Sequence, residues 1–267
     1  CSRDWSSDVC SSDLQSINYD PELSKIILAV ANSSPLLLGH GKYTKDLKKA
    51  VIRIGFERLR HVFLLYALNN SLIISSNSFF DQQTFMRHSL FVSLLSHGFA
   101  KLVVPEFMRE AQISGLIHDV GLGVMTTQCP DVLAKLMDYC AEHKQNFTEA
   151  EKNLQVELHN EYSAEVACNW IPTTDTVRKI LEGHNHTIKP TPNSQEPENL
   201  TILMVLIDIL NISDTLAHGY GFGFKGYVRD TKISSKLLAR LGIKLEDAKE
   251  NLRESIEFSS VLLQAFY

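Results

Sequence analysis

Apolar residues recur along this sequence at the spacing of an α-helix, and this periodicity constrains the fold more than any other feature. The first clear run places apolar residues at i, i+3, i+4 and i+7, namely Leu23, Ile26, Ile27 and Val30. That spacing puts the four side chains on one face of a helix. The pattern resumes at Leu47 and at Leu59. No segment keeps the apolar and polar alternation of a half-buried strand, so we predict an all-α fold.

The content of turn-forming residues agrees with this prediction. Average usage would give about 32 Gly and Pro residues in a chain of this length, whereas the sequence has 13 Gly and 8 Pro. The polar segment 69–81 reads as a hinge, which divides the chain into a helical lobe at 15–83 and a second lobe at 84–267. For the second lobe we predict helices over 84–101, 106–118, 130–143, 149–170, 174–184, 199–217, 233–240 and 246–265.

Residues 1–14 stand apart from the rest of the sequence. They read CSRDWSSDVCSSDL, with SSD repeated and no periodicity that a packed element could use. The segment resembles a translated sequencing adapter, and we leave it out of the fold prediction. The other interpretation is an ordinary Ser/Asp-rich tail.

Charge and hydropathy exclude two classes of function. The 26 basic and 31 acidic side chains give a net charge of −5 without a cluster of Lys and Arg, which argues against a nucleic-acid partner. The longest apolar stretch, 200–210, contains Asp208 and is shorter than the roughly 20 residues of a membrane span. The five cysteines lack the spacing of a disulfide framework or a zinc site, so we expect a cytoplasmic protein.

Several histidines and aspartates are placed where they could hold a metal ion. His118 and Asp119 end an apolar run, and the helical spacing points His159 and His184 toward the core. His88 and Asp214 lie on two further predicted helices. Imidazoles and carboxylates that converge from several helices form the metal sites of helical bundles. The alternative is that each histidine separately donates to a backbone carbonyl.

These positions carry a resemblance to a known family. The motifs are GLIHDVG at 115–121, Glu151, His159, WIP at 170–172, EGHNH at 182–186, DPELSKIILAVANSS at 20–34 and KAVIRIG at 49–55. In this order they resemble the HD-related output domain, HDOD, a bacterial signalling relative of the HD phosphohydrolases and HD-GYP phosphodiesterases. The resemblance covers about 18–260. It implies a two-lobed helical HDOD fold with an HD-like second lobe.

The resemblance also implies a set of metal ligands. The HD pattern falls on His88, His118, Asp119 and a distal aspartate, a set that could hold a divalent ion such as Mn, Fe or Mg. No cofactor is assigned from the sequence, and we expect metal binding to be weak or absent. ISDTLAHGYGFG is similar to a family segment that selects Asp214 as the distal aspartate, with Asp208 as the second choice. His159 and His184 match additional histidines of HD-GYP relatives.

Two departures from the enzymes of this superfamily bear on activity. Active HD enzymes usually have Lys where this chain has Leu122, and a positive charge there would help to offset phosphate charge. The GYP loop is also missing, since TIKP at 187–190 follows His186. We therefore expect a non-catalytic signal-transduction output module that acts through signalling proteins or fused sensory domains. The alternative is a metal-dependent phosphohydrolase or cyclic-dinucleotide phosphodiesterase.

Overall fold

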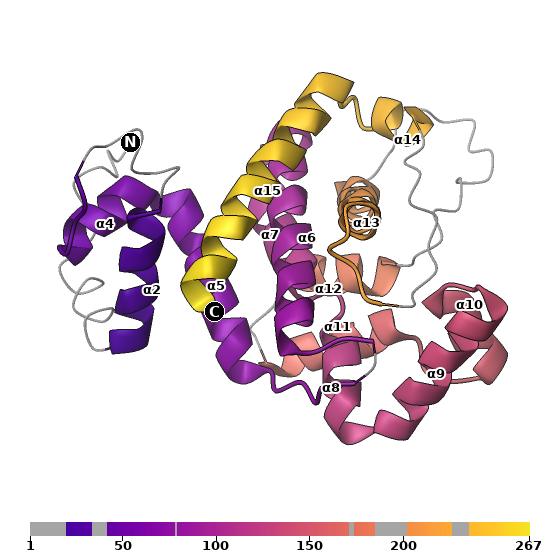
Figure 1. Cartoon of the computed structure of the whole chain (residues 1–267). Coiled ribbons are helices and arrows are strands. Elements are labelled where there is room, and N and C mark those ends of the chain that lie inside the picture. The colour runs from indigo at the N-terminus through magenta and orange to yellow at the C-terminus, as the bar shows by residue number, and fades with distance from the viewer. Residues whose placement is uncertain (1–19, 34–41, 78, 171–173, 185–201, 226–234) are drawn as a thin grey trace. The chain divides into compact units, whose positions relative to one another are not determined.

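The structure is a computed structural model, and it describes residues 20–33, 42–77, 79–170, 174–184, 202–225 and 235–267. Every regular element in this part of the chain is a helix, as predicted (Figure 1). Residues 1–14, including the suspected adapter, lie outside the described ranges.

The helices of the described residues follow one another along the chain. They are α2 (Pro21–Ala31), α4 (Leu47–Ile54), α5 (Phe56–Ser71), α6 (Gln82–Val103), the 3₁₀ turn η1 (Pro105–Phe107), α7 (Met108–Ile117), α8 (Val120–Gln128), α9 (Pro130–His143), α10 (Phe147–Leu154), α11 (His159–Trp170), α12 (Asp175–Gly183), α13 (Ile202–Gly219), α14 (Ser235–Arg240) and α15 (Leu245–Phe266). The chain divides into two compact units, one containing residues up to 67 together with 257–267, and the other containing 68–256. The domain boundaries given above for the sequence stay predictions.

In the first unit, α2 packs against α4 and buries the predicted apolar stripe. Asp20 caps α2 by accepting hydrogen bonds from the backbone N–H groups of Glu22 and Leu23. The Tyr66 hydroxyl donates to the other carboxylate oxygen of Asp20 over 2.7 Å. The Asn32 side chain donates to the Thr44 carbonyl and accepts from the Thr44 backbone N–H. These two hydrogen bonds connect the end of α2 to the segment before α4.

The second unit is built around α6, which is buried along almost its whole length. Phe91, Leu95 and Phe99 of α6 lie in one core cluster with Ile209 and Ile212 of α13. By length and composition α13 could cross a membrane, but 56% of its most apolar window is buried inside the protein. That burial is typical of a core helix.

Two helix predictions for this unit are wrong in detail. The predicted helix 149–170 is divided into α10 and α11, because Gln155 takes a left-handed conformation with φ of 54°. Helix α8 begins at Val120 and was not among the predicted helices, because the helix predicted at 106–118 ends before it. Gly121 lets α8 approach α11 closely, because a Cβ at this position would lie 2.8 Å from the backbone nitrogen of Ser163.

Candidate metal centre

The His118–Asp119 pair lies at the junction of α7 and α8, inside the second unit. His118 follows the last residue of α7 and Asp119 precedes the first residue of α8, and both are almost fully buried. Gly115 allows this placement because a Cβ there would lie 2.8 Å from the Val92 carbonyl oxygen of α6. The close contact between α6 and α7 therefore brings the pair next to His88.

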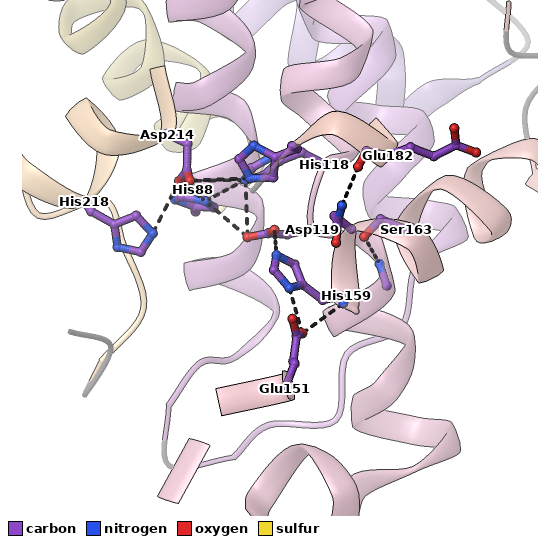
Figure 2. Close-up of polar contacts among 12 residues, drawn as sticks. His88, His118, Asp119, Glu151, His159, Ser163, Glu182, Asp214 and His218 are labelled. Carbon is purple, nitrogen blue, oxygen red and sulfur yellow. Dashed lines mark hydrogen bonds and ion pairs between the residues drawn. The ribbon is translucent and has the colours of Figure 1, made fainter. Parts of the chain in front are cut away.

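The structure brings all six predicted ligand residues together. Figure 2 shows five of them, His88, His118, Asp119, His159 and Asp214. His88 comes from α6, His159 from α11, His184 from the end of α12 and Asp214 from α13. One oxygen of Asp119 lies 3.5 Å from His88 Nε2 and 3.3 Å from His118 Nε2, and the other lies 3.9 Å from His159 Nε2.

Asp214 lies between the imidazoles in a similar way. Its Oδ1 is 3.4 Å from His88 Nε2, and its Oδ2 is 3.6 Å from His184 Nε2. Asp208, the second choice from the sequence, instead forms an ion pair with Arg240 of α14. The aspartate that faces the histidines is therefore Asp214.

Hydrogen bonds behind three of the imidazoles determine which ring nitrogen carries the proton. His88 Nδ1 lies 3.1 Å from the Phe222 carbonyl, His118 Nδ1 lies 3.0 Å from the Gly115 carbonyl, and His159 Nδ1 lies 2.7 Å from Glu151 Oε1. A carbonyl or carboxylate oxygen only accepts, so each Nδ1 donates. In a neutral ring, Nε2 then presents a lone pair toward the centre of the cluster. This arrangement is typical of histidines that bind metals.

The centre of the cluster consequently collects electron-pair donors. The Nε2 atoms of His88 and His118 are only 3.2 Å apart, and carboxylate oxygens lie beside them. Asp119 Oδ1 is buried without a hydrogen-bond partner, and an unmatched buried charge is costly. A divalent cation would satisfy these donors, and the residue types suit a first-row transition metal. The groups present therefore fit the metal that the HD pattern implies.

The pKa values favour the protonation states of metal ligands at two positions. Burial lowers the pKa of His88 to about 3, so this imidazole is neutral at physiological pH. Burial alone would raise the pKa of the Asp119 carboxyl, but positive charge on the neighbouring imidazoles, led by His118, holds it well below its usual value. When those rings are neutral, a bound cation would supply this charge instead. His159 differs, because the Glu151 carboxylate outweighs burial and raises its pKa. A cation at His159 would therefore compete with a proton.

Two residues near the centre were not predicted as part of the ligand set, although Glu151 is among the motif residues that carry the family resemblance. His218 Nε2 lies 3.3 Å from Asp214 Oδ1, and Glu151 accepts from both the ring and the backbone N–H of His159. His218 follows Asp214 by four residues on the same helix, so helical spacing alone could have identified it. The role of Glu151 depends on a contact across the left-handed turn at Gln155, which periodicity does not reveal.

The buried helical core, with a His/Asp cluster at its centre, defines a domain of the HD type. A family model for the HDOD domain matches residues 7–186, and the chain belongs to this family. A relative from Treponema pallidum is 25% identical over 185 residues. This match covers 68% of the chain and 34% of the relative, so the chain spans about a third of that protein's length.

Solved structures with the same fold have diverse names. An HDOD domain protein of unknown function from Geobacter sulfurreducens has a TM-score of 0.71 at 19% identity, covering 97% of this chain and 87% of that one. A protein from Shewanella amazonensis, provisionally named a phosphohydrolase, has a TM-score of 0.68 at 20% identity. The match covers 99% of this chain and 91% of that one. A protein from Marinobacter aquaeolei, provisionally named a signal transduction protein, has a TM-score of 0.66 at 16% identity. The match covers 96% of this chain and 55% of that one. At these identities the likeness concerns the fold alone.

Proposed function

We propose that this chain is a signal-transduction output domain whose buried His/Asp cluster holds a divalent transition metal for structural support. The observation that carries the proposal is the set of lone pairs at His88, His118 and Asp119, which face one another in a site that solvent does not reach. Such a centre stabilises a fold by an amount that rises with the logarithm of the ratio of ion concentration to dissociation constant.

The ligands are assigned by their distances. His88, His118, Asp119 and Asp214 would hold one ion, and the opposite oxygen of Asp119 would share a second position with His159 and His184. Bound there, the ion would supply the positive charge that the two carboxylates and the inward imidazoles lack.

Burial argues against hydrolysis at this centre. The exposed fraction of each of the six predicted ligands is 1% or less, whereas a phosphoester substrate must reach the metal and its bound water. Leu122 is fully buried in α8 and brings no charge to offset a phosphate. The site therefore suits a bound ion better than a substrate.

Action through partners is the part of the proposal that concerns signalling. The Marinobacter protein with the same fold is provisionally named a signal transduction protein, and the chain covers 55% of it. The chain likewise covers only 34% of its Treponema relative. Both fractions support a domain that operates beside other domains, so we propose signalling proteins or fused sensory domains of a bacterial cytoplasm as its partners.

A second candidate is a metal-dependent phosphohydrolase or cyclic-dinucleotide phosphodiesterase. It is favoured by the retention of the whole ligand set within one cluster. A second Shewanella amazonensis protein, provisionally named a metal-dependent phosphohydrolase, also shares the fold with a TM-score of 0.53 at 14% identity.

A turnover assay with metal analysis distinguishes the two. Purified chain receives excess Mn²⁺, Fe²⁺ or Mg²⁺ and is assayed with bis-p-nitrophenyl phosphate and with cyclic dinucleotides. Asp119→Ala tests the centre, and Asp131→Ala on the exposed face of α9 is the matched control. We expect bound metal that Asp119→Ala removes, and no turnover. Turnover near the common range of about 1–10³ s⁻¹, abolished by Asp119→Ala alone, would establish the second candidate.

A further inference from the structure

His218 is an inward histidine that the HD ligand pattern does not include. It lies in the last turn of α13, four residues after Asp214, and its side chain is only 6% exposed. Its Nε2 atom is 3.3 Å from Asp214 Oδ1, and its ring centroid lies 5.1 Å from that of His88. The residue therefore faces the edge of the cluster that is formed by α6 and α13 (Figure 2).

The segment after α13 holds this imidazole in place. Gly223 lies so close to the ring that a Cβ at this position would be 2.1 Å from His218 Nδ1. Gly221, two residues earlier, is held in place as well, because Arg87 donates a hydrogen bond to its carbonyl over 2.8 Å. Only a residue without a side chain fits at 223 while His218 keeps this position.

The same segment is anchored to α6 by Phe222. Its ring stacks on Phe91 at 3.8 Å between centroids, and the Arg87 guanidinium lies over it. Its carbonyl is the acceptor that fixes the His88 proton on Nδ1. One short segment thus positions His218 and sets the tautomer of His88.

The resulting geometry is that of a ligand set. Ligand atoms of His88, Asp214 and His218 all lie within 4.8 Å of one another. A plain hydrogen bond from His218 to Asp214 would leave the His88 lone pair facing the same carboxylate oxygen at 3.4 Å. A cation shared by all three residues removes this repulsion.

We propose that His218 is a further ligand, and that it binds the same divalent ion as His88 and Asp214. The inference rests on the proposed function, because it requires that the cluster binds a metal. With this residue the ion gains another neutral imidazole, which suits Mn²⁺, Fe²⁺, Co²⁺ or Zn²⁺ better than Mg²⁺ or Ca²⁺.

The test uses Co²⁺ as the probe. The full chain is stripped with a chelator and titrated with Co²⁺ while its visible absorption and the bound metal are measured. The variants are His218→Gln, which removes the ligand, and Gly223→Ala, which displaces the ring. His143→Gln on the exposed surface of α9 is the matched control. Circular dichroism of the stripped variants verifies that they are folded.

We expect both variants to bind one Co²⁺ at least about tenfold more weakly than wild type, the smallest effect expected when a group that supports a metal is lost. Their visible spectrum should also change, whereas His143→Gln should match wild type. If wild type binds Co²⁺ and the variants have the same affinity and spectrum, His218 is not a ligand and the metal centre stands. If wild type binds no Co²⁺, the proposed metal centre itself fails.

If His218→Gln does not fold, Gly223→Ala carries the test. An alanine methyl fits at 223 once the His218 ring moves, so this variant needs only a local change. Unaltered Co²⁺ binding by folded Gly223→Ala would overturn the inference.

Discussion

The Nε2 atoms of His88 and His118 lie 3.2 Å apart, and neither can donate a proton to the other when both rings are neutral. Each ring already donates from Nδ1 to a backbone carbonyl, Phe222 for His88 and Gly115 for His118. Two lone pairs held this close in a buried site are unfavourable without a positive charge between them. The interpretation of the cluster as a metal centre follows from this relationship.

Metal binding should raise the melting temperature. An ion at a hundred times its dissociation constant stabilises the folded state by about 2.7 kcal/mol, which corresponds to roughly 5–10 °C for a domain of this size. Differential scanning calorimetry with Mn²⁺ and with chelator measures the difference. In Asp119→Ala we expect the difference to disappear. An equal rise in that variant would show that the ion binds elsewhere.

Replacement of Glu151 by Gln should weaken metal binding without touching a ligand. Glu151 accepts from His159 Nδ1 over 2.7 Å and from the His159 backbone N–H over 2.9 Å. Loss of such a supporting group typically costs about 10–100-fold in metal affinity. Isothermal titration with Mn²⁺ measures the change, and Glu149→Gln on the exposed side of α10 is the control. Equal affinities for the two variants would mean that His159 needs no such support.

Gly115→Ala should destabilise the second unit. The added Cβ would meet the Val92 carbonyl oxygen at 2.8 Å and the Ser93 Cα at 2.9 Å, both of them backbone atoms that cannot easily move. Overpacking of this kind costs about 1–3 kcal/mol of the free energy of unfolding. Urea denaturation compares this variant with Ala141→Ser on the exposed surface of α9. A Gly115→Ala variant as stable as wild type would show that α6 and α7 can separate at low cost.

Acid should remove the contribution of Asp20 in the first unit. The backbone N–H of Leu23 and the Tyr66 hydroxyl lower the pKa of this carboxyl below its ordinary 3.8. Because the folded pKa is the lower one, the contribution is present above pH 3.8 and is lost as the pH falls through the folded pKa. Asp20→Asn, whose amide still caps the helix, should melt below wild type at pH 7, and the difference should shrink by pH 3. A difference that does not depend on pH would show that the charge contributes nothing.

Local periodicity was sufficient to predict most helices. The spacing from Leu23 predicted α2, and the helix predicted at 84–101 corresponds to α6. The division at Gln155 was not predictable because a left-handed turn at a Gln has no apolar signature. Helix α8 was missed because Gly121 serves the close packing against Ser163 and Gly123 packs against Leu72, and both are tertiary contacts.

The candidate site was predicted through the motif resemblance more than through periodicity. Helical spacing turned His159 and His184 inward and suggested that His88 and Asp214 converge on them, and the HD pattern then identified them as a ligand set. The sequence left Asp208 open as an alternative to Asp214. The structure excludes it because Asp208 forms an ion pair with Arg240 of a separate helix. The proton position on His88 depends on the Phe222 carbonyl, 134 residues away. Contacts at such separations arise from the packed fold and not from local spacing.

Anomalous X-ray diffraction from crystals grown with Mn²⁺ tests the central claim most directly. Data at an energy where manganese scatters anomalously should show a peak between His88, His118, Asp119 and Asp214, within coordination distance of the ligand atoms. Such a peak would establish that the facing lone pairs hold a cation. A cluster without a peak, in which protonated imidazoles donate to Asp119 and Asp214, would contradict the account.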